Sequence, residues 1–352
     1  MARKLEQFKQ IMTEVYGAYT DKDWQPKPFS HSESRYLWTD AYGVCNYLTL
    51  FKETGEAQYC TQAKNLISAV HDTLGKTRDG GAARLGNSPP EQPLLGGLRI
   101  GKPDEEGPGM SGDGQYFHYL TKWMFALNRM SLAVKEPRYN QWAIEMARAV
   151  HWKFCAPDGN RMYWKMSIDL SRPLTTAEGG LDTFDGLTIY MLLQETAKSF
   201  VPDFDGLGTR EKSQWEQENL KPEIDHMQEL VATRISRYTA HDTLDAGEAL
   251  WLAHFFPEED YACQLKRRAG QAVEQLWLAG EFIGPPTVRL GFREFGTTIG
   301  VQMHPDLWKT WEGRVEKLHE LWLEHLQARD NDITPVMYCT SLIPGAVRKS
   351  FL

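Results

Sequence analysis

The feature that most constrains the fold of this chain is an acidic residue followed closely by glycine, repeated along the sequence. Each repeat opens a short apolar segment. The acid–glycine starts are Asp40 to Gly43, Asp113-Gly114, Asp185-Gly186, Asp245 to Gly247 and Glu294 to Gly296, and a sixth apolar segment begins at Thr334-Pro335 without the acid. The six segments are apolar nearly all round and rich in small residues. That pattern is typical of helices buried on every side.

Longer segments with a single apolar face alternate with the buried ones. They span residues 1–16, 56–74, 137–154, 222–238, 257–278 and 305–326. Several open with Pro followed by an acid, which suits the first turn of a helix. Six buried helices inside six one-faced helices make two layers, and the inner layer has no face toward water. The sequence therefore predicts one all-α domain over residues 1–352, with the inner helices beginning around one cavity.

Alternating residues after the turn signal at 157–160 predict a small β-hairpin over residues 159–174, projecting above the cavity. The alternation of helices resembles the six-hairpin glycosidase-like superfamily, the (α/α)6 toroids, over essentially the whole chain. Members of that superfamily include glycoside hydrolases, unsaturated glucuronyl hydrolases, sugar epimerases and polysaccharide lyases, and other α/α toroids cyclise or transfer prenyl groups. The resemblance implies a fold and a cavity, and it assigns no reaction by itself.

Composition narrows the class of protein. A net charge of −8 without any basic run argues against nucleic-acid binding. No stretch approaches the 18 apolar residues of a membrane span, and the N-terminus lacks the apolar run of a secretion signal. The five cysteines are scattered, without a CxxC pair or a Cys/His cluster in the sequence. We therefore expect a cytoplasmic protein with free thiols, no metal and no cofactor.

Acids at the helix starts are the candidate catalytic groups. Asp is a preferred N-cap, so each acid has a structural explanation. Carboxylates that converge in a cavity repel one another, and this separates a proton donor from an ionised base, as glycosidic cleavage requires. Asp113 is the first choice, because Gly112 and Gly114 leave room beside it. The other candidates are Asp182, Asp185, Asp40 and the nearby His118.

Aromatic and charged residues near the same helix starts are the candidate substrate contacts. They are Trp38, Tyr42, Arg99, Tyr116, Trp164, Asp245, Arg293 and Glu294. Residues 76–112 form a long Gly- and Pro-rich connection, which we expect to cover the cavity and to carry Arg99 or Lys102 to the ligand. We expect Arg293 to pair with Glu294, with neutralisation of an acidic substrate as the alternative.

These residues favour an enzyme that acts on a small molecule or an oligosaccharide, and hydrolysis by two carboxylates comes first. Isomerisation or cyclisation of a small metabolite, with His118 or His241 joining a carboxylate, is the second class, and an epimerase would need a facing pair among His118, His241 and His304. Neither the DxDD nor the DDxxD motif of terpenoid enzymes occurs around Asp182 or Asp242. A ligand-binding protein without catalysis is the third class.

Overall fold

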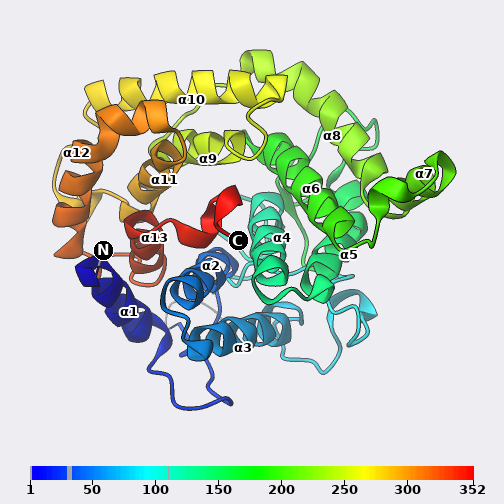
Figure 1. Cartoon of the computed structure of the whole chain (residues 1–352), viewed down its shortest axis with the longest axis horizontal. Helices are drawn as coiled ribbons and strands as arrows, with labels where there is room; N and C mark the ends of the chain where they lie inside the picture. Colours follow the sequence, from blue (N-terminus) through cyan, green and yellow to red (C-terminus); the bar gives the residue numbers. More distant parts are fainter. Residues whose placement is uncertain (1, 30–33, 110) are drawn as a thin grey trace. The chain divides into compact units, whose positions relative to one another are not determined.

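The computed structural model describes residues 2–29, 34–109 and 111–352, and over these residues the regular secondary structure is almost entirely helical (Figure 1). The α-helices are α1 Ala2–Tyr16, α2 Leu37–Thr54, α3 Ala57–Leu74, α4 Phe117–Val134, α5 Pro137–Phe154, α6 Asp182–Ser199, α7 Thr209–Glu218, α8 Lys221–Arg234, α9 Thr243–Ala253, α10 Asp260–Leu278, α11 Gly291–Gln302, α12 Pro305–Leu323 and α13 Ile333–Leu342. The strands are β1 Gln115–Tyr116 and β2 Lys165–Met166.

The helices confirm the predicted alternation. The six buried segments form α2, α4, α6, α9, α11 and α13, and the six one-faced segments form α1, α3, α5, α8, α10 and α12. Residue 1, placed in the first predicted helix, lies outside the described residues. Helix α13 is buried along its whole length, whereas α10 buries only Tyr261, Ala262, Leu265, Ala269 and Val273.

One helix is absent from the prediction. Helix α7 buries no residue, so the apolar pattern that reveals the other helices is missing from it. Within the described part of the chain, no helix combines the length and the hydropathy that crossing a membrane would require.

The chain divides into two compact units. Unit 1 comprises Met1–Lys27, Cys45–Gln62 and Ala232–Leu352, and unit 2 comprises Pro28–Val44 and Ala63–Val231. Helices α2 and α3 contribute residues to both units. A single domain over residues 1–352 stays a prediction.

In unit 1, glycines set the packing of α9 against α11, which lie side by side in Figure 1. A Cβ on Gly247 would lie 2.1 Å from the carbonyl carbon of Gly296, so only glycine allows this approach. Thr297 Oγ1 donates a hydrogen bond to the Thr243 carbonyl. Farther along, a ring nitrogen of His304, Nε2, lies 2.8 Å from the Leu250 carbonyl oxygen. Residue numbers rise in the same direction on both helices, so α9 and α11 are parallel and begin at the same end.

In unit 2, polar side chains join α4 to α6, and α5 packs against both helices. Three pairs of side-chain atoms connect the two helices. In order from the helix N-termini they are His118 Nδ1–Asp182 Oδ1 at 3.3 Å, Lys122 Nζ–Asp185 Oδ1 at 3.0 Å and Asn128 Nδ2–Thr196 Oγ1 at 2.8 Å. Since both sets of numbers rise together, α4 and α6 are also parallel. The expectation that inner helices begin at a common end is met within each of these pairs.

The small sheet differs from the expected hairpin. Strand β2 pairs antiparallel with β1, with Gln115 opposite Met166 and Tyr116 opposite Lys165. Within residues 159–174 themselves the pairing is reduced to an isolated bridge between Met166 and Pro173. The segment therefore uses the residues just before α4 as its partner strand, a long-range pairing that local alternation does not reveal.

The buried histidine His71 makes stability depend on pH. Its Nε2 accepts a hydrogen bond from Trp123 Nε1 at 3.1 Å, and burial lowers the His71 pKa to about 3. Below the ordinary pKa of about 6.5, the unfolded chain binds a proton that the folded chain does not. This one group should therefore lower the free energy of unfolding by about 1.4 kcal/mol for each unit of falling pH.

Denaturant unfolding at about pH 6 and about pH 5 measures this slope. The slope should be shallower in His71→Gln than in the wild type. An unchanged slope in His71→Gln would contradict the account.

Candidate active site in unit 2

A histidine–aspartate pair stands at the starts of α4 and α6. His118 is the second residue of α4, and Asp182 is the first residue of α6, where the helix dipole stabilises a negative charge. Their side chains are 3.3 Å apart, with Asp182 buried and His118 32% exposed. A carboxylate beside Nδ1 favours the tautomer with the proton on that nitrogen, which leaves Nε2 free to accept a proton. The pair can therefore act as one acid–base group.

Asp182 differs from the other acids of unit 2 in its partners. Asp40 lies 3.5 Å from Arg35, and Asp185 lies 3.0 Å from Lys122. The other candidate acids of unit 2, Asp40, Asp113 and Asp185, each pair with an arginine or a lysine. Asp182 pairs with a histidine.

Aromatic rings gather around His118. Trp38 lies 6.2 Å from the His118 ring and 5.8 Å from Tyr42, between ring centroids. Tyr116 lies 6.1 Å from His118 and 4.9 Å from Trp164. Trp164 and His118 are half-buried, so part of this cluster faces solvent. The structure thus brings together four of the predicted substrate contacts with the predicted histidine.

Asp113 has a different environment from the one expected. Its carboxylate is fully buried and accepts hydrogen bonds from Arg99 at 3.0 Å, Arg78 at 3.2 Å and the Gly101 amide at 3.0 Å. It is also no cap of α4, since Tyr116 occupies the N-cap position. Tyr116 donates its hydroxyl hydrogen bond to the Gly112 carbonyl, and His118 faces Asp182. This geometry gives Asp113 an anchoring role.

Lys165 and Lys102 make contacts that anchor the described part of the connection over residues 76–112, of which residue 110 lies outside the described residues. Lys165 Nζ donates to the carbonyls of Gly107, Gly109 and Gly112 at 2.8, 3.0 and 3.1 Å. Lys102 lies over the Tyr116 ring, 5.4 Å from its centroid. A pocket of about 570 Å³ beside the connection is lined by Arg99 together with Lys76 and Arg78. The prediction that this connection carries Arg99 or Lys102 to a ligand stays a prediction.

The acids of unit 1 have structural partners. Asp245 accepts from the His241 amide at 3.0 Å, and the α9 N-cap is Asp242. Glu294 receives two hydrogen bonds from Arg289, at 2.7 and 2.6 Å. These contacts satisfy backbone and guanidinium donors at the helix starts.

The expected pairing of Arg293 with Glu294 is wrong. Arg293 pairs with Asp242 at 2.7 Å instead. Adjacent residues on a helix point in directions about 100° apart, so Arg293 and Glu294 face different neighbours.

His304 is an unsuitable partner for a residue at the start of α11. It is the N-cap residue of α12 and lies beyond the last residue of α11, so it is at the opposite end of α11 from Glu294. Its bond to the Leu250 carbonyl gives it a structural role.

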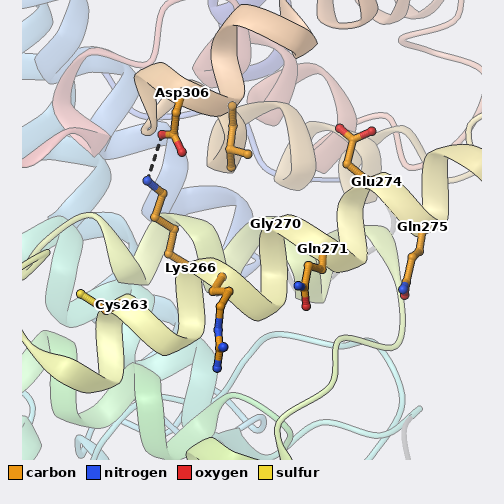
Figure 2. Close-up of a pocket in the computed structure, with 9 residues that line it drawn as sticks. Cys263, Lys266, Gly270, Gln271, Glu274, Gln275 and Asp306 are labelled. Atoms are coloured by element: carbon orange, nitrogen blue, oxygen red, sulfur yellow. Dashed lines mark hydrogen bonds and ion pairs between the residues drawn. The ribbon is translucent and has the colours of Figure 1, made fainter.

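A pocket of about 740 Å³ in unit 1 has none of the predicted site residues in its lining. Figure 2 shows its lining side chains, among them Lys266 and Asp306, which form an ion pair at 2.9 Å. The lining comes from α10 and the first turn of α12, and it contains no histidine. Nothing in this surface links it to the candidate site.

Sequence reasoning missed Lys122 and Arg35, the cations that balance Asp185 and Asp40. Lys122 had a signal, because it is a charged residue inside an otherwise apolar segment, and such a residue is buried only with a partner. Arg35 had no comparable signal.

No family model matches the sequence, and no curated protein matches it either. Solved structures do match in fold. An α-mannanase of family GH76 from Bacteroides thetaiotaomicron superposes with a TM-score of 0.60 at 9% identity, covering 97% of this chain and 95% of that one. A cellobiose 2-epimerase from Spirochaeta thermophila gives 0.58 at 11% identity, covering 98% of each chain. A D-mannose isomerase gives 0.55 at 10% identity, covering 97% of this chain and 96% of that one.

These likenesses show the fold. The chain has the (α/α)6 toroid fold class that its sequence predicted.

Replacing Asp113 tests its anchoring role. Asp113→Asn leaves the buried Arg99 without a counter-charge, so the free energy of unfolding should fall by about 3 kcal/mol or more. The matched control is Asp72→Asn, which removes an exposed partner of Arg84 and should cost less than about 1 kcal/mol. Equal stability of the two variants in denaturant unfolding would refute the anchor.

Proposed function

We propose that this protein is an enzyme that acts on carbohydrates by acid–base catalysis, with His118 and Asp182 as its proton-transfer group. The observation that carries the proposal is the 3.3 Å contact between the two side chains at the starts of α4 and α6. Asp182 holds the ring and balances the charge that appears when Nε2 takes up a proton. His118 is partly exposed, and the edge of its ring that carries Nε2 contacts the substrate.

The rings around His118 support a sugar as the substrate. Aromatic faces stack on the apolar faces of pyranose rings, and the polar edges of Trp and Tyr reach hydroxyl groups. Trp164 is half-buried, and its ring lies 4.9 Å from Tyr116, so it is available to a ligand on its open side. The GH76 mannanase, the cellobiose epimerase and the mannose isomerase that share this fold are all named for sugars.

The dyad best supports an aldose–ketose isomerisation. One base that takes the proton from C2 of an open-chain sugar and delivers a solvent-exchangeable proton to C1 works on a single face, while a second proton passes from the C2 hydroxyl to the carbonyl oxygen on C1. Epimerisation returns the proton on the opposite face and therefore needs a second group. Because His118 and Asp182 are in contact, they act as one group.

Hydrolysis of a glycosidic bond is the second candidate. It is favoured by Asp182 and Asp185, two carboxylates within the first turn of α6, and by the GH76 enzyme of the same fold. Hydrolysis needs one carboxyl group to protonate the leaving oxygen and another to activate water. Asp185 would have to give up its contact with Lys122 to take either role.

Incubation with sugars in heavy water distinguishes the two reactions. With mannose or glucose, isomerisation should give the ketose and place solvent deuterium on carbon, measured by NMR. With cellobiose and manno-oligosaccharides, hydrolysis should release reducing ends without deuterium on carbon. If neither product forms from any of these sugars, the carbohydrate proposal is wrong.

Substitutions of His118 and Asp182 test their role in the reaction that these assays detect. His118→Gln and Asp182→Asn should each lower kcat by about 100-fold or more, as expected for loss of a general acid–base group. His325→Gln, on a turn remote in sequence from both residues, should keep full activity. Normal turnover in a folded His118→Gln variant would show that the His118–Asp182 pair is not the proton-transfer group.

Trp164 should contribute to substrate affinity and not to proton transfer. Loss of one aromatic contact costs about 0.5–1.5 kcal/mol, so Trp164→Ala should raise KM by about 2- to 12-fold with little change in kcat. Trp308→Ala on α12 is the matched control. A fall in kcat at unchanged KM would contradict the stacking role.

A further inference from the structure

A second cluster of reactive side chains lies in unit 2, away from the His118–Asp182 pair in the sequence. His151 and Cys155 are one helical turn apart at the end of α5, and His226 belongs to α8. His151 Nε2 is 2.9 Å from His226 Nδ1, and Cys155 Sγ is 4.0 Å from the first nitrogen and 3.9 Å from the second. The three side chains therefore present two imidazole nitrogens and one sulfur to a common point.

These separations are close to those around a tetrahedral zinc ion. Zn–N bonds of about 2.05 Å and a Zn–S bond of about 2.3 Å put two nitrogens about 3.3 Å apart and each about 3.6 Å from the sulfur. The three distances in the protein each differ from these values by about 0.5 Å or less. Side-chain rotations of a small size would close the difference.

The orientation of His226 matches that of a metal-binding histidine. Its far nitrogen, Nε2, is 2.7 Å from the Gly159 carbonyl oxygen and can act only as a donor to it. That bond fixes the proton on Nε2 and leaves the lone pair of Nδ1 directed at His151 and Cys155. Backbone carbonyls commonly fix metal-binding histidines in this way.

The surroundings leave polar atoms unsatisfied. His151 is fully buried, and its Nδ1 has no hydrogen-bond partner among the described residues. The hydroxyl of Tyr190, whose ring lies 5.7 Å from that of His151, is also buried without a partner in the described part of the chain. Such groups are rare in folded proteins, and an ordered water is a usual explanation; an ion bound at His151 Nε2 lies on the other side of the ring from Nδ1.

We propose that His151, Cys155 and His226 bind a zinc ion that fastens the end of α5 to α8. Two nitrogens and a thiolate suit zinc, whereas calcium and magnesium prefer oxygen ligands. Three protein ligands leave a fourth position for water, and the partial exposure of Cys155 and His226 gives the ion and the water access. On binding, the Cys155 thiol loses its proton to solvent and the sulfur bonds to the metal.

Cobalt titration tests the site directly. The whole protein is stripped with a chelator, exchanged into metal-free buffer and titrated first with Co²⁺ and then with Zn²⁺. One equivalent of Co²⁺ should produce a thiolate-to-cobalt charge-transfer band, which one equivalent of Zn²⁺ should abolish. Bound zinc should also raise the Tm, since a ligand that binds only the folded state stabilises it.

Matched variants identify the ligands. Cys155→Ser should lose the charge-transfer band and the zinc-dependent rise in Tm, and His226→Gln should weaken Zn²⁺ binding by about 10-fold or more. Cys263→Ser, which removes an exposed thiol on α10, should behave like the wild type. Absence of the band in the wild type, or its persistence in Cys155→Ser, would overturn the proposal. Either result is independent of activity on sugars.

Discussion

The buried ion pair between Lys122 and Asp185 is the interaction on which the candidate site depends. Both side chains are almost fully buried, and they join α4 to α6 at 3.0 Å. Removing either one would leave an uncompensated buried charge, at a cost of about 3–5 kcal/mol. The pair also sets the register of the two helices. His118 lies one turn before Lys122, and Asp182 lies one turn before Asp185, so alignment of the ion pair brings the histidine to the aspartate.

Much of the fold could be predicted from the sequence because burial leaves a periodic pattern. Helices buried on all sides, such as α13, and helices with one apolar face, such as α10, have different patterns, and their alternation gave the architecture. Helix α7 escaped prediction because it buries nothing. The pairing of β2 with β1 was not predicted, because β1 is only two residues long and lies about 50 residues away in the chain.

The candidate site was harder to predict, since its chemistry depends on partners that sequence spacing does not give. Asp113, the first choice, has glycines on both sides, yet its environment is determined by Arg99 and Arg78 from the long connection before it. The sequence predicted His118 and Asp182 as site residues, and the structure adds their contact. His151, Cys155 and His226 were not predicted as a site. Two of these are one turn apart in the sequence, but the third is contributed by a helix more than 70 residues later.

The division of the chain into two units has a consequence for its synthesis. Unit 2 is nearly continuous, whereas unit 1 is assembled from three separate stretches that flank and interrupt it. Within unit 1, Cys339 on α13 contacts the carbonyl of Phe8 on α1, a partner 331 residues earlier. Contacts between such distant residues form slowly, and they need the late segment to be present. On a ribosome, α1 can meet α2 early, through Met12 with Asn46 and Tyr16 with Tyr47. Its contact with α13 forms only after that helix has emerged, so unit 1 is completed late in synthesis.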